Sequence, residues 1–118
     1  MSRDFCIGYL MGIIVGEGSF TGDKTPPSLA VKMHEHDPEP MLMLQQVFGG
    51  RINGPYEGGA NRGRHIIWQL RGKELRKAIP IIEANLPLSR KRRQFETWRV
   101  KYGLNPNVAS WNIAAVRK

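Results

Sequence analysis

The spacing of hydrophobic positions predicts four helices along the chain. Residues 5–16 form an uncharged run, FCIGYLMGIIVG, whose apolar side chains surround the predicted helix and indicate a buried one. Apolar residues recur at helical spacing over 37–48, which opens with Asp-Pro-Glu and ends at two glycines, as helices often do. The same spacing predicts helices over 73–84, which Pro80 should kink or divide, and from Ser89 to about residue 102.

Four segments between these helices alternate between apolar and polar residues or are bounded by turn residues, which is typical of strands. They span residues 19–24, 28–34, 51–56 and 64–71. The resulting order is α-β-β-α-β-β-α-α. Two hairpins, each followed by a helix, predict an α+β domain in which one curved antiparallel sheet carries helices on one face.

Three glycines, Gly8, Gly12 and Gly16, recur every four residues and therefore line one side of the first predicted helix. Each glycine inside a helix costs about 1 kcal/mol relative to alanine, so a stripe of them favours close approach of another backbone. No other segment of the chain resembles this one. We therefore expect the stripe to pack against the same helix of a second copy; the alternative is that it packs on the chain's own sheet.

The net charge is +8, from 18 lysine and arginine residues against 10 aspartate and glutamate residues. Residues 1–60 have a balance of −3 and residues 61–118 one of +11, so the basic charge is concentrated in the second half. Such a basic half binds a polyanion, most often nucleic acid, or merely increases solubility, and charge alone leaves both interpretations open.

The polar positions of the strands favour the nucleic-acid interpretation, because they give the predicted sheet a polar and basic outer face. Arginine, lysine, glutamine and asparagine side chains on such a face can bind base edges in the major groove of DNA. The candidate DNA-binding residues on the strands and their turns are Thr21, Asp23, Lys24, Ser28, Lys32, His34, Arg51, Asn53, Arg62, Arg64, His65, Gln69 and Arg71.

Membrane insertion and secretion are both disfavoured for the first apolar run. Its twelve residues are too few to span a bilayer, which takes about 20. A signal peptide would fit this length, but Asp4 lies in the leader and the sequence Gly16-Glu17-Gly18 is a poor cleavage site. We therefore expect an intracellular protein without a secretion signal. The single cysteine, Cys6, excludes an intrachain disulfide.

Residues 10–20, LMGIIVGEGSF, resemble the LAGLIDADG motif of homing endonucleases, in the variant that ends Gly-Glu-Gly-Ser-Phe. Val15 departs from the motif, because the family usually has an acid there. Residues 34–50 look like the family's strand-to-helix segment, and residues 86–95, LPLSRKRRQF, resemble the basic segment that enters its last core helix.

This resemblance covers roughly residues 5–103 and implies the family's α-β-β-α-β-β-α core with a saddle-shaped antiparallel sheet. We therefore expect an endonuclease domain over 1–103, and a tail over 104–118 that could add one short helix. Only one copy of the motif is present, and members with a single motif act as homodimers. The resemblance thus implies the same dimer as the glycine stripe.

The resemblance also implies catalytic roles. The family's metal-binding acid falls at Glu17, and Gly16 is the second candidate metal ligand. Glu35 falls nearest a family glutamine that helps to place a metal-bound water, and the basic residue near the scissile phosphate falls at Arg90 or Lys91. The implied cofactor is Mg²⁺ or Mn²⁺; Mg²⁺ binds one or two carboxylates together with phosphate oxygens and waters.

The expected function is therefore a site-specific homing endonuclease that makes a metal-dependent, staggered double-strand cut in a long pseudo-palindromic DNA site. The alternative is a non-cleaving nucleic-acid binder of the same fold, either an intron RNA maturase or a DNA-binding regulator. The run from His34 to Asp37 could also chelate zinc, but it lacks the spacing of a known zinc motif.

Overall fold

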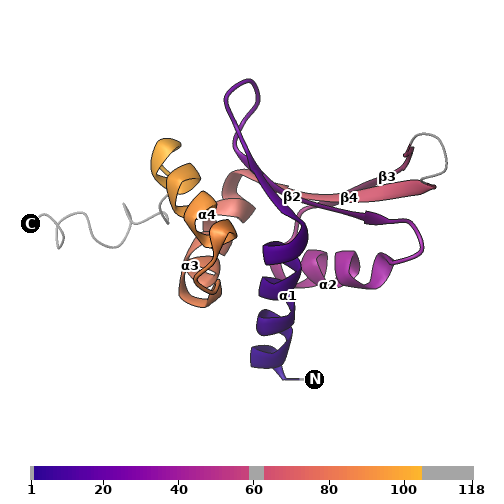
Figure 1. The fold of residues 1–118 in the computed structure, drawn as a ribbon, viewed down its shortest axis with the longest axis horizontal. Helices are drawn as coiled ribbons and strands as arrows, with labels where there is room; N and C mark the ends of the chain where they lie inside the picture. The colour runs from indigo at the N-terminus through magenta and orange to yellow at the C-terminus, as the bar shows by residue number, and fades with distance from the viewer. Residues whose placement is uncertain (1, 59–62, 105–118) are drawn as a thin grey trace, which may run out of the picture.

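A computed structural model of the chain describes residues 2–58 and 63–104 and confirms the predicted order of helices and strands. The elements are α1 (Arg3–Glu17), β1 (Gly18–Thr21), β2 (Ser28–His34), α2 (Pro38–Phe48), β3 (Arg51–Glu57), β4 (Arg64–Arg71), α3 (Gly72–Asn85) and α4 (Arg90–Lys101) (Figure 1). The strands pair antiparallel in the order β1-β2-β4-β3. The fold is therefore α+β, as predicted.

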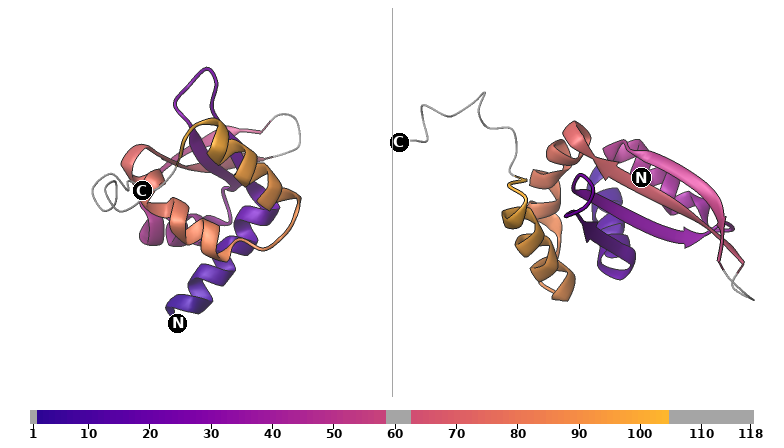
Figure 2. Two further views of the ribbon diagram at one scale, coloured as in Figure 1. Left: turned by 90° about the vertical axis from the view of Figure 1, so that its left-hand side faces the viewer. Right: turned by 90° about the horizontal axis from the view of Figure 1, so that it is seen from above.

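The sheet is curved, and its two faces have different surroundings. Figure 1 shows it rising at both ends, at the β1–β2 turn and at the β3–β4 end, while α1 and α2 lie beneath it. Helix α3 also packs against β2 and β4, and α4 lies alongside the edge strand β1. Seen from above in Figure 2, α3 and α4 lie beside one end of the sheet. The helices of residues 2–58 and 63–104 leave the opposite, concave face uncovered.

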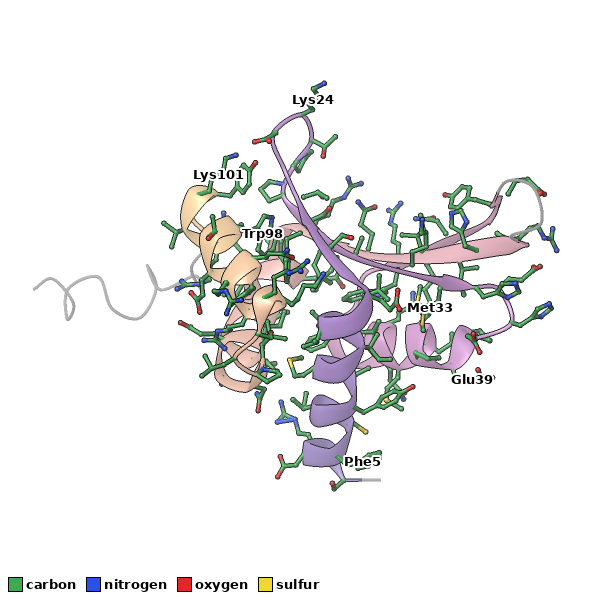
Figure 3. The ribbon with its side chains drawn as sticks, viewed as in Figure 1. Phe5, Lys24, Met33, Glu39, Trp98 and Lys101 are labelled. Atoms are coloured by element: carbon green, nitrogen blue, oxygen red, sulfur yellow. The ribbon has the colours of Figure 1, made fainter. Side chains whose placement is uncertain are left out.

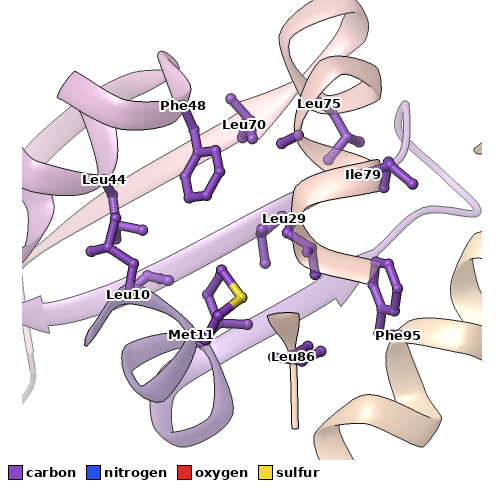
Figure 4. Packing of buried hydrophobic residues seen from close by; sticks show 14 of the residues in the cluster. Leu10, Met11, Leu29, Leu44, Phe48, Leu70, Leu75, Ile79, Leu86 and Phe95 are labelled. Carbon is purple, nitrogen blue, oxygen red and sulfur yellow. The ribbon is translucent and has the colours of Figure 1, made fainter. Parts of the chain in front are cut away.

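The core lies between the sheet and its helices. Leu10, Leu29, Trp68, Ile79 and Phe95 come from five different elements, and none of them exposes any side-chain area. Figure 4 shows side chains of this cluster converging between the helices and the strands. Truncating such a residue to alanine costs about 2–5 kcal/mol, so this cluster fixes the position of every element around it.

The start of α4 and the end of α2 lie at the residues that the sequence singles out, whereas α1 begins at Arg3, two residues before its predicted start. The hydroxyl of Ser89 accepts the backbone N–H of Arg92 at 3.0 Å and caps α4. Helix α2 ends before Gly49 and Gly50, whose φ angles of 88° and 90° favour glycine. Pro80 lies inside α3 without dividing it, so of the two expected effects, a kink or a division, the division is wrong. The proline is exposed, so the carbonyl that loses its helical partner lies on the solvent side of the helix.

Strand β1 is shorter than predicted, because it ends at Thr21 and not at Lys24. Asp23 adopts a left-handed backbone conformation with φ 63°, which a strand residue cannot have. Its carboxylate accepts hydrogen bonds from the hydroxyl of Tyr102 and, at 3.0 Å, from the ammonium of Lys101. The end of α4 therefore holds the turn between β1 and β2.

The core extends slightly beyond the predicted domain boundary, because Leu104 is buried against it at 3% exposure. The predicted tail helix lies outside the described residues. Across the described ranges, no helix combines the length and the apolar character needed to cross a membrane.

Candidate active site and nucleic-acid interface

Glu17 is the last residue of α1, and its side chain is exposed. The hydrogen bonds and ion pairs among residues 2–58 and 63–104 leave its carboxylate without a partner. The carbonyl groups of the last helical turn, that of Gly16 among them, have no partner within the helix and carry its negative partial charge. The last turn of α1 contains no basic residue. The end of α1 therefore presents oxygen ligands and negative charge, which fit a hard divalent cation.

A cation of the protein itself lies next to this helix end. Lys91, in the first turn of α4, donates a hydrogen bond of 2.5 Å to the carbonyl oxygen of Gly18, which follows Glu17 directly. Gly18 fits here because a Cβ at this position would lie 2.7 Å from the carbonyl oxygen of Ile14. Arg90 instead lines a cleft between α4 and the β1–β2 hairpin. Of the two predicted basic residues, the structure therefore brings Lys91 to the end of the motif.

Glu35 lies elsewhere. In the antiparallel register Gly18 is opposite Val31, and Glu35 follows Val31 by four residues, just past the end of β2, about 13 Å away at the rise of a strand. Its carboxylate pairs with the guanidinium of Arg64 at 2.9 Å and accepts from its Nε at 3.1 Å. Within one chain, the predicted catalytic Glu35 is thus engaged by Arg64 and does not join Glu17.

The strand register brings most of the predicted DNA-binding residues together on the concave face. Directly paired residues share a face of the sheet. The three-residue rows Lys32–Ile67–Asn53 and Ala30–Gln69–Arg51 lie on the face opposite the row Val31–Trp68–Ile52, which packs on the core. By the same alternation the predicted residues on this face are Thr21, Lys32, His34, Arg51, Asn53, His65, Gln69 and Arg71.

Two residues of the prediction do not contribute to this surface: Ser28 is on the concave face by register but is buried, and Arg64 is on the other face. Ser28 is 1% exposed, because its hydroxyl lies between Thr21 Oγ1 at 2.9 Å and Gln69 Nε2 at 3.2 Å, so its expected exposure is wrong. Arg64 is an odd number of residues from Gln69 along β4, so it lies on the other face of the sheet. The expectation that it lies on the polar face is therefore also wrong.

The turns of the sheet hold the remaining predicted residues. Lys24 lies at the tip of the β1–β2 turn (Figure 3), and Asp23 beside it is bonded to the end of α4. Those bonds, first the one from Tyr102 and then that from Lys101, lower the pKa of the Asp23 carboxyl below its ordinary range. Arg62 lies outside the described residues.

The concave face also carries residues that the sequence reasoning missed. Tyr56 is 46% exposed, and its ring lies 5.7 Å from that of His65. Alternation along the strand does not predict which face of the sheet Tyr56 lies on, because the register shifts between Asn53 and Tyr56 around Gly54 and Pro55. A second missed pair, Gln94 and Thr97, lies off the concave face and lines a cleft beside α4 together with Arg90 and Arg93 of the basic run. Its signal is the spacing of polar residues with Arg90 along one helix face.

The glycine stripe of α1 faces away from the core. Ile7, Leu10, Met11 and Ile14 make the buried side of the helix. A Cβ placed at Gly8, Gly12 or Gly16 would meet no atom within 4 Å. The alternative in which the stripe packs on the chain's own sheet is therefore wrong. Phe5 and Tyr9 flank the stripe and are 58% and 40% exposed, so this side of α1 is apolar and open.

Zinc chelation around His34 finds no support in the geometry. Within the described ranges, no three histidine, cysteine, aspartate or glutamate side chains converge on a metal site. The backbone N–H of His36 donates to Nδ1 of His34, and the two rings stack 4.8 Å apart. Among the described residues, Glu17 therefore has no second carboxylate or imidazole group beside it that could complete a metal site.

The solved structures that this chain resembles include homing endonucleases. The chain superimposes on the homing endonuclease I-TnaI (TM-score 0.65, 19% identity, 80% of this chain and 69% of that one). It also superimposes on the group I intron-encoded homing endonuclease I-CeuI complexed with DNA, with a TM-score of 0.67 and 20% identity over 92% of this chain and 58% of that one. A third match is the LAGLIDADG meganuclease I-CpaMI bound to uncleaved DNA, with a TM-score of 0.67 and 21% identity over 82% of this chain and 37% of that one.

These likenesses establish the fold: the chain has the LAGLIDADG architecture. It spans just over two thirds of the first of these structures, and less of the other two. No family model and no curated protein sequence matches the chain.

Proposed function

We propose that this chain is one half of a homodimeric, metal-dependent, site-specific DNA endonuclease. The observation that carries the proposal is that two opposite charges, one acidic and one basic, lie at the same helix end without pairing with each other. The unpartnered carboxylate of Glu17 ends α1, and the ammonium of Lys91 is bonded to the next residue. Both lie where α1 enters the edge strand of a concave sheet whose open face is polar.

Glu17 and the carbonyl group of Gly16 would hold the divalent ion in this proposal. When bound, Mg²⁺ or Mn²⁺ would polarise a phosphate and lower the pKa of a water. Lys91 supplies positive charge beside the same helix end and would stabilise the negative charge that develops on a phosphate. The residues of the chain thus cover two needs of phosphodiester hydrolysis, a ligand for a metal ion and a fixed cation.

The concave face would hold the duplex. Lys32, Arg51 and Arg71 supply charge there, while Asn53 and Gln69 supply the donor and acceptor groups that read base edges. DNA is a partner of I-CeuI and I-CpaMI, which share this fold. The shared fold and the polar face both support duplex DNA as the partner here.

The open side of α1 supports the homodimer. Exposed apolar side chains are costly in water, and glycines without neighbours let a second helix come close. Packing two α1 helices along Gly8, Gly12 and Gly16 would place a Glu17 from each chain near a two-fold axis. That symmetry suits a target whose two halves are related as a palindrome.

Incubation with a randomised duplex library and Mg²⁺ tests the proposal, with binding measured separately. Glu17→Gln should abolish cleavage and retain binding, while Glu39→Gln, which neutralises an exposed acid of α2, should cleave as the wild type does. Retained cleavage in Glu17→Gln would overturn the role of this acid. A wild type that binds without cutting, or prefers intron RNA to duplex, would be a binder of the same fold.

A further inference from the structure

The basic residues of α4 divide into two groups with different surroundings. Arg92 pairs with Glu96 at 2.9 Å and donates to the carbonyl oxygens of Glu83 and Leu86. Arg99 also pairs with Glu96, at 3.0 Å. These two arginines are bound within the fold and join α4 to the end of α3.

Arg90 and Arg93 are different, because they are exposed and take part in no hydrogen bond or ion pair among residues 2–58 and 63–104. Together with Gln94 and Thr97 they line a cleft of about 690 Å³ between α4 and the β1–β2 hairpin. We call these four residues the α4 face. Figure 3 shows the end of this helix, at Lys101, close to the hairpin whose tip carries Lys24.

The other residues of the cleft are already engaged. Trp98 donates from Nε1 to the carbonyl oxygen of Thr21 at 2.9 Å and packs against Phe20 with ring centroids 4.8 Å apart. Asp23, the acidic residue of the lining, is held by Lys101 and Tyr102. The unpaired charge of the cleft is therefore positive.

We infer that the α4 face is a second contact surface for the duplex and binds phosphates of one DNA strand beside the sheet. The inference rests on the proposed function. From Arg90 to Thr97 the helix rises about 10 Å, which is roughly the axial length of three phosphates on one strand. Guanidinium, amide and hydroxyl groups are the side chains that proteins use to bind phosphate oxygens. Since α4 runs beside the edge strand, these contacts extend the footprint of the concave face.

The first test is the salt dependence of binding to a long mixed-sequence duplex. Arg93→Gln should weaken binding equally for all sequences and reduce the slope of log K against log salt by about one, because one phosphate contact is lost. Lys77→Gln is the matched control, because it removes one exposed positive charge from α3. It should leave both the slope and the affinity unchanged.

A charge reversal gives an independent second test. Gln94→Glu places a carboxylate in the middle of the α4 face, and Gln46→Glu makes the same change on the exposed side of α2, beneath the sheet. Only Gln94→Glu should lower the affinity for DNA relative to the wild type, by about tenfold at salt concentrations between 50 and 200 mM. All four positions are exposed, and circular dichroism verifies that the variants fold.

Equal slopes for Arg93→Gln and Lys77→Gln would overturn the inference and leave the proposed function intact. So would an effect on structured RNA without one on duplex DNA. A wild type that binds no duplex at any salt concentration would overturn both the inference and the proposed function.

Discussion

Lys91 donates a hydrogen bond to the carbonyl oxygen of Gly18, 73 positions earlier in the chain. This contact links the first turn of the last core helix to the residue after Glu17, so it sets the distance between the cation and the acid of the candidate site. Phe95 and Trp98, one and two turns farther along α4, pack on Phe20 of β1 and fix the helix against the strand. The position of Lys91 is thus determined by the core.

Lys91→Met should lower the rate of DNA cleavage far more than the affinity for DNA. Removing one preorganised donor from a developing negative charge costs about a hundredfold or more in rate. Single-turnover cleavage with protein in excess over DNA separates this effect from binding. Arg90→Met is the matched control, because its side chain faces the α4 cleft, and it should weaken binding with little change in that rate. The reverse result would assign the catalytic cation to Arg90.

Much of the fold could be predicted because local patterns determine it. The bounds of β2 and β4 follow from alternation alone, and Ser89 caps α4 as its residue type suggests. The choice between Arg90 and Lys91 could not be made in this way. Neighbouring helix residues point about 100° apart, and the rotation of α4 is set by how its aromatic side chains pack on β1.

The contacts of single polar residues could not be predicted from the sequence pattern either, because they depend on strands that are far apart in the chain. Ser28 alternates as an exposed residue does, yet Thr21 and Gln69 from the two neighbouring strands cover it. Arg64 and Glu35 are 29 positions apart, and only the register of β2 and β4 brings them into contact.

Gly12→Leu should prevent self-association of the chain. Gly12 is in the middle of the exposed stripe, where its missing side chain leaves open space within one chain, so the leucine should not disturb the fold itself. In the proposed dimer the same leucine would separate the two helices. Light scattering at micromolar concentration, with and without DNA, measures the effect. Gln46→Leu adds a leucine to the exposed side of α2 and should leave the oligomeric state unchanged. A wild-type monomer under both conditions would contradict the homodimer.

Ser89→Ala should lower the free energy of unfolding by about 1 kcal/mol, the usual cost of a lost N-cap. The Ser89 hydroxyl accepts the N–H of Arg92 and also donates to the carbonyl oxygen of Pro87 at 3.0 Å. Ser2→Ala removes the corresponding cap of α1, where the hydroxyl accepts the N–H of Phe5 at 3.1 Å. Urea denaturation should show a smaller loss for Ser2→Ala, because Ser2 lies at the exposed start of the chain's first helix. Equal losses of unfolding free energy in the two variants would mean that burial around the N-cap does not change what the cap contributes to stability.

Asp23→Asn should destabilise the protein at neutral pH and have less effect in acid. Asparagine tolerates the left-handed backbone conformation of this residue but cannot pair with the ammonium of Lys101. The hydrogen bonds from Tyr102 and Lys101 lower the pKa of the Asp23 carboxyl in the folded protein. A lowered folded-state pKa gives stability that is present above the pKa of the unfolded chain and is lost as pH falls through the folded-state value. Asp23 in turn raises the pKa of Lys101. The stability that this interaction gives to the folded protein is present at neutral pH and is lost only in strong base, where the ammonium loses its proton.

The difference in unfolding free energy between wild type and Asp23→Asn should therefore be constant from about pH 7 to pH 5 and shrink below about pH 4, where the wild-type carboxyl takes up a proton. Urea titrations at a series of pH values measure it. Asp37→Asn is the control for the loss of one carboxylate, because Asp37 makes no side-chain hydrogen bond at the start of α2. A difference that grows toward acid would show that Asp23 does not hold the β1–β2 turn against α4. The turn would then be positioned by the contacts of Trp98 with Thr21 and Phe20 alone.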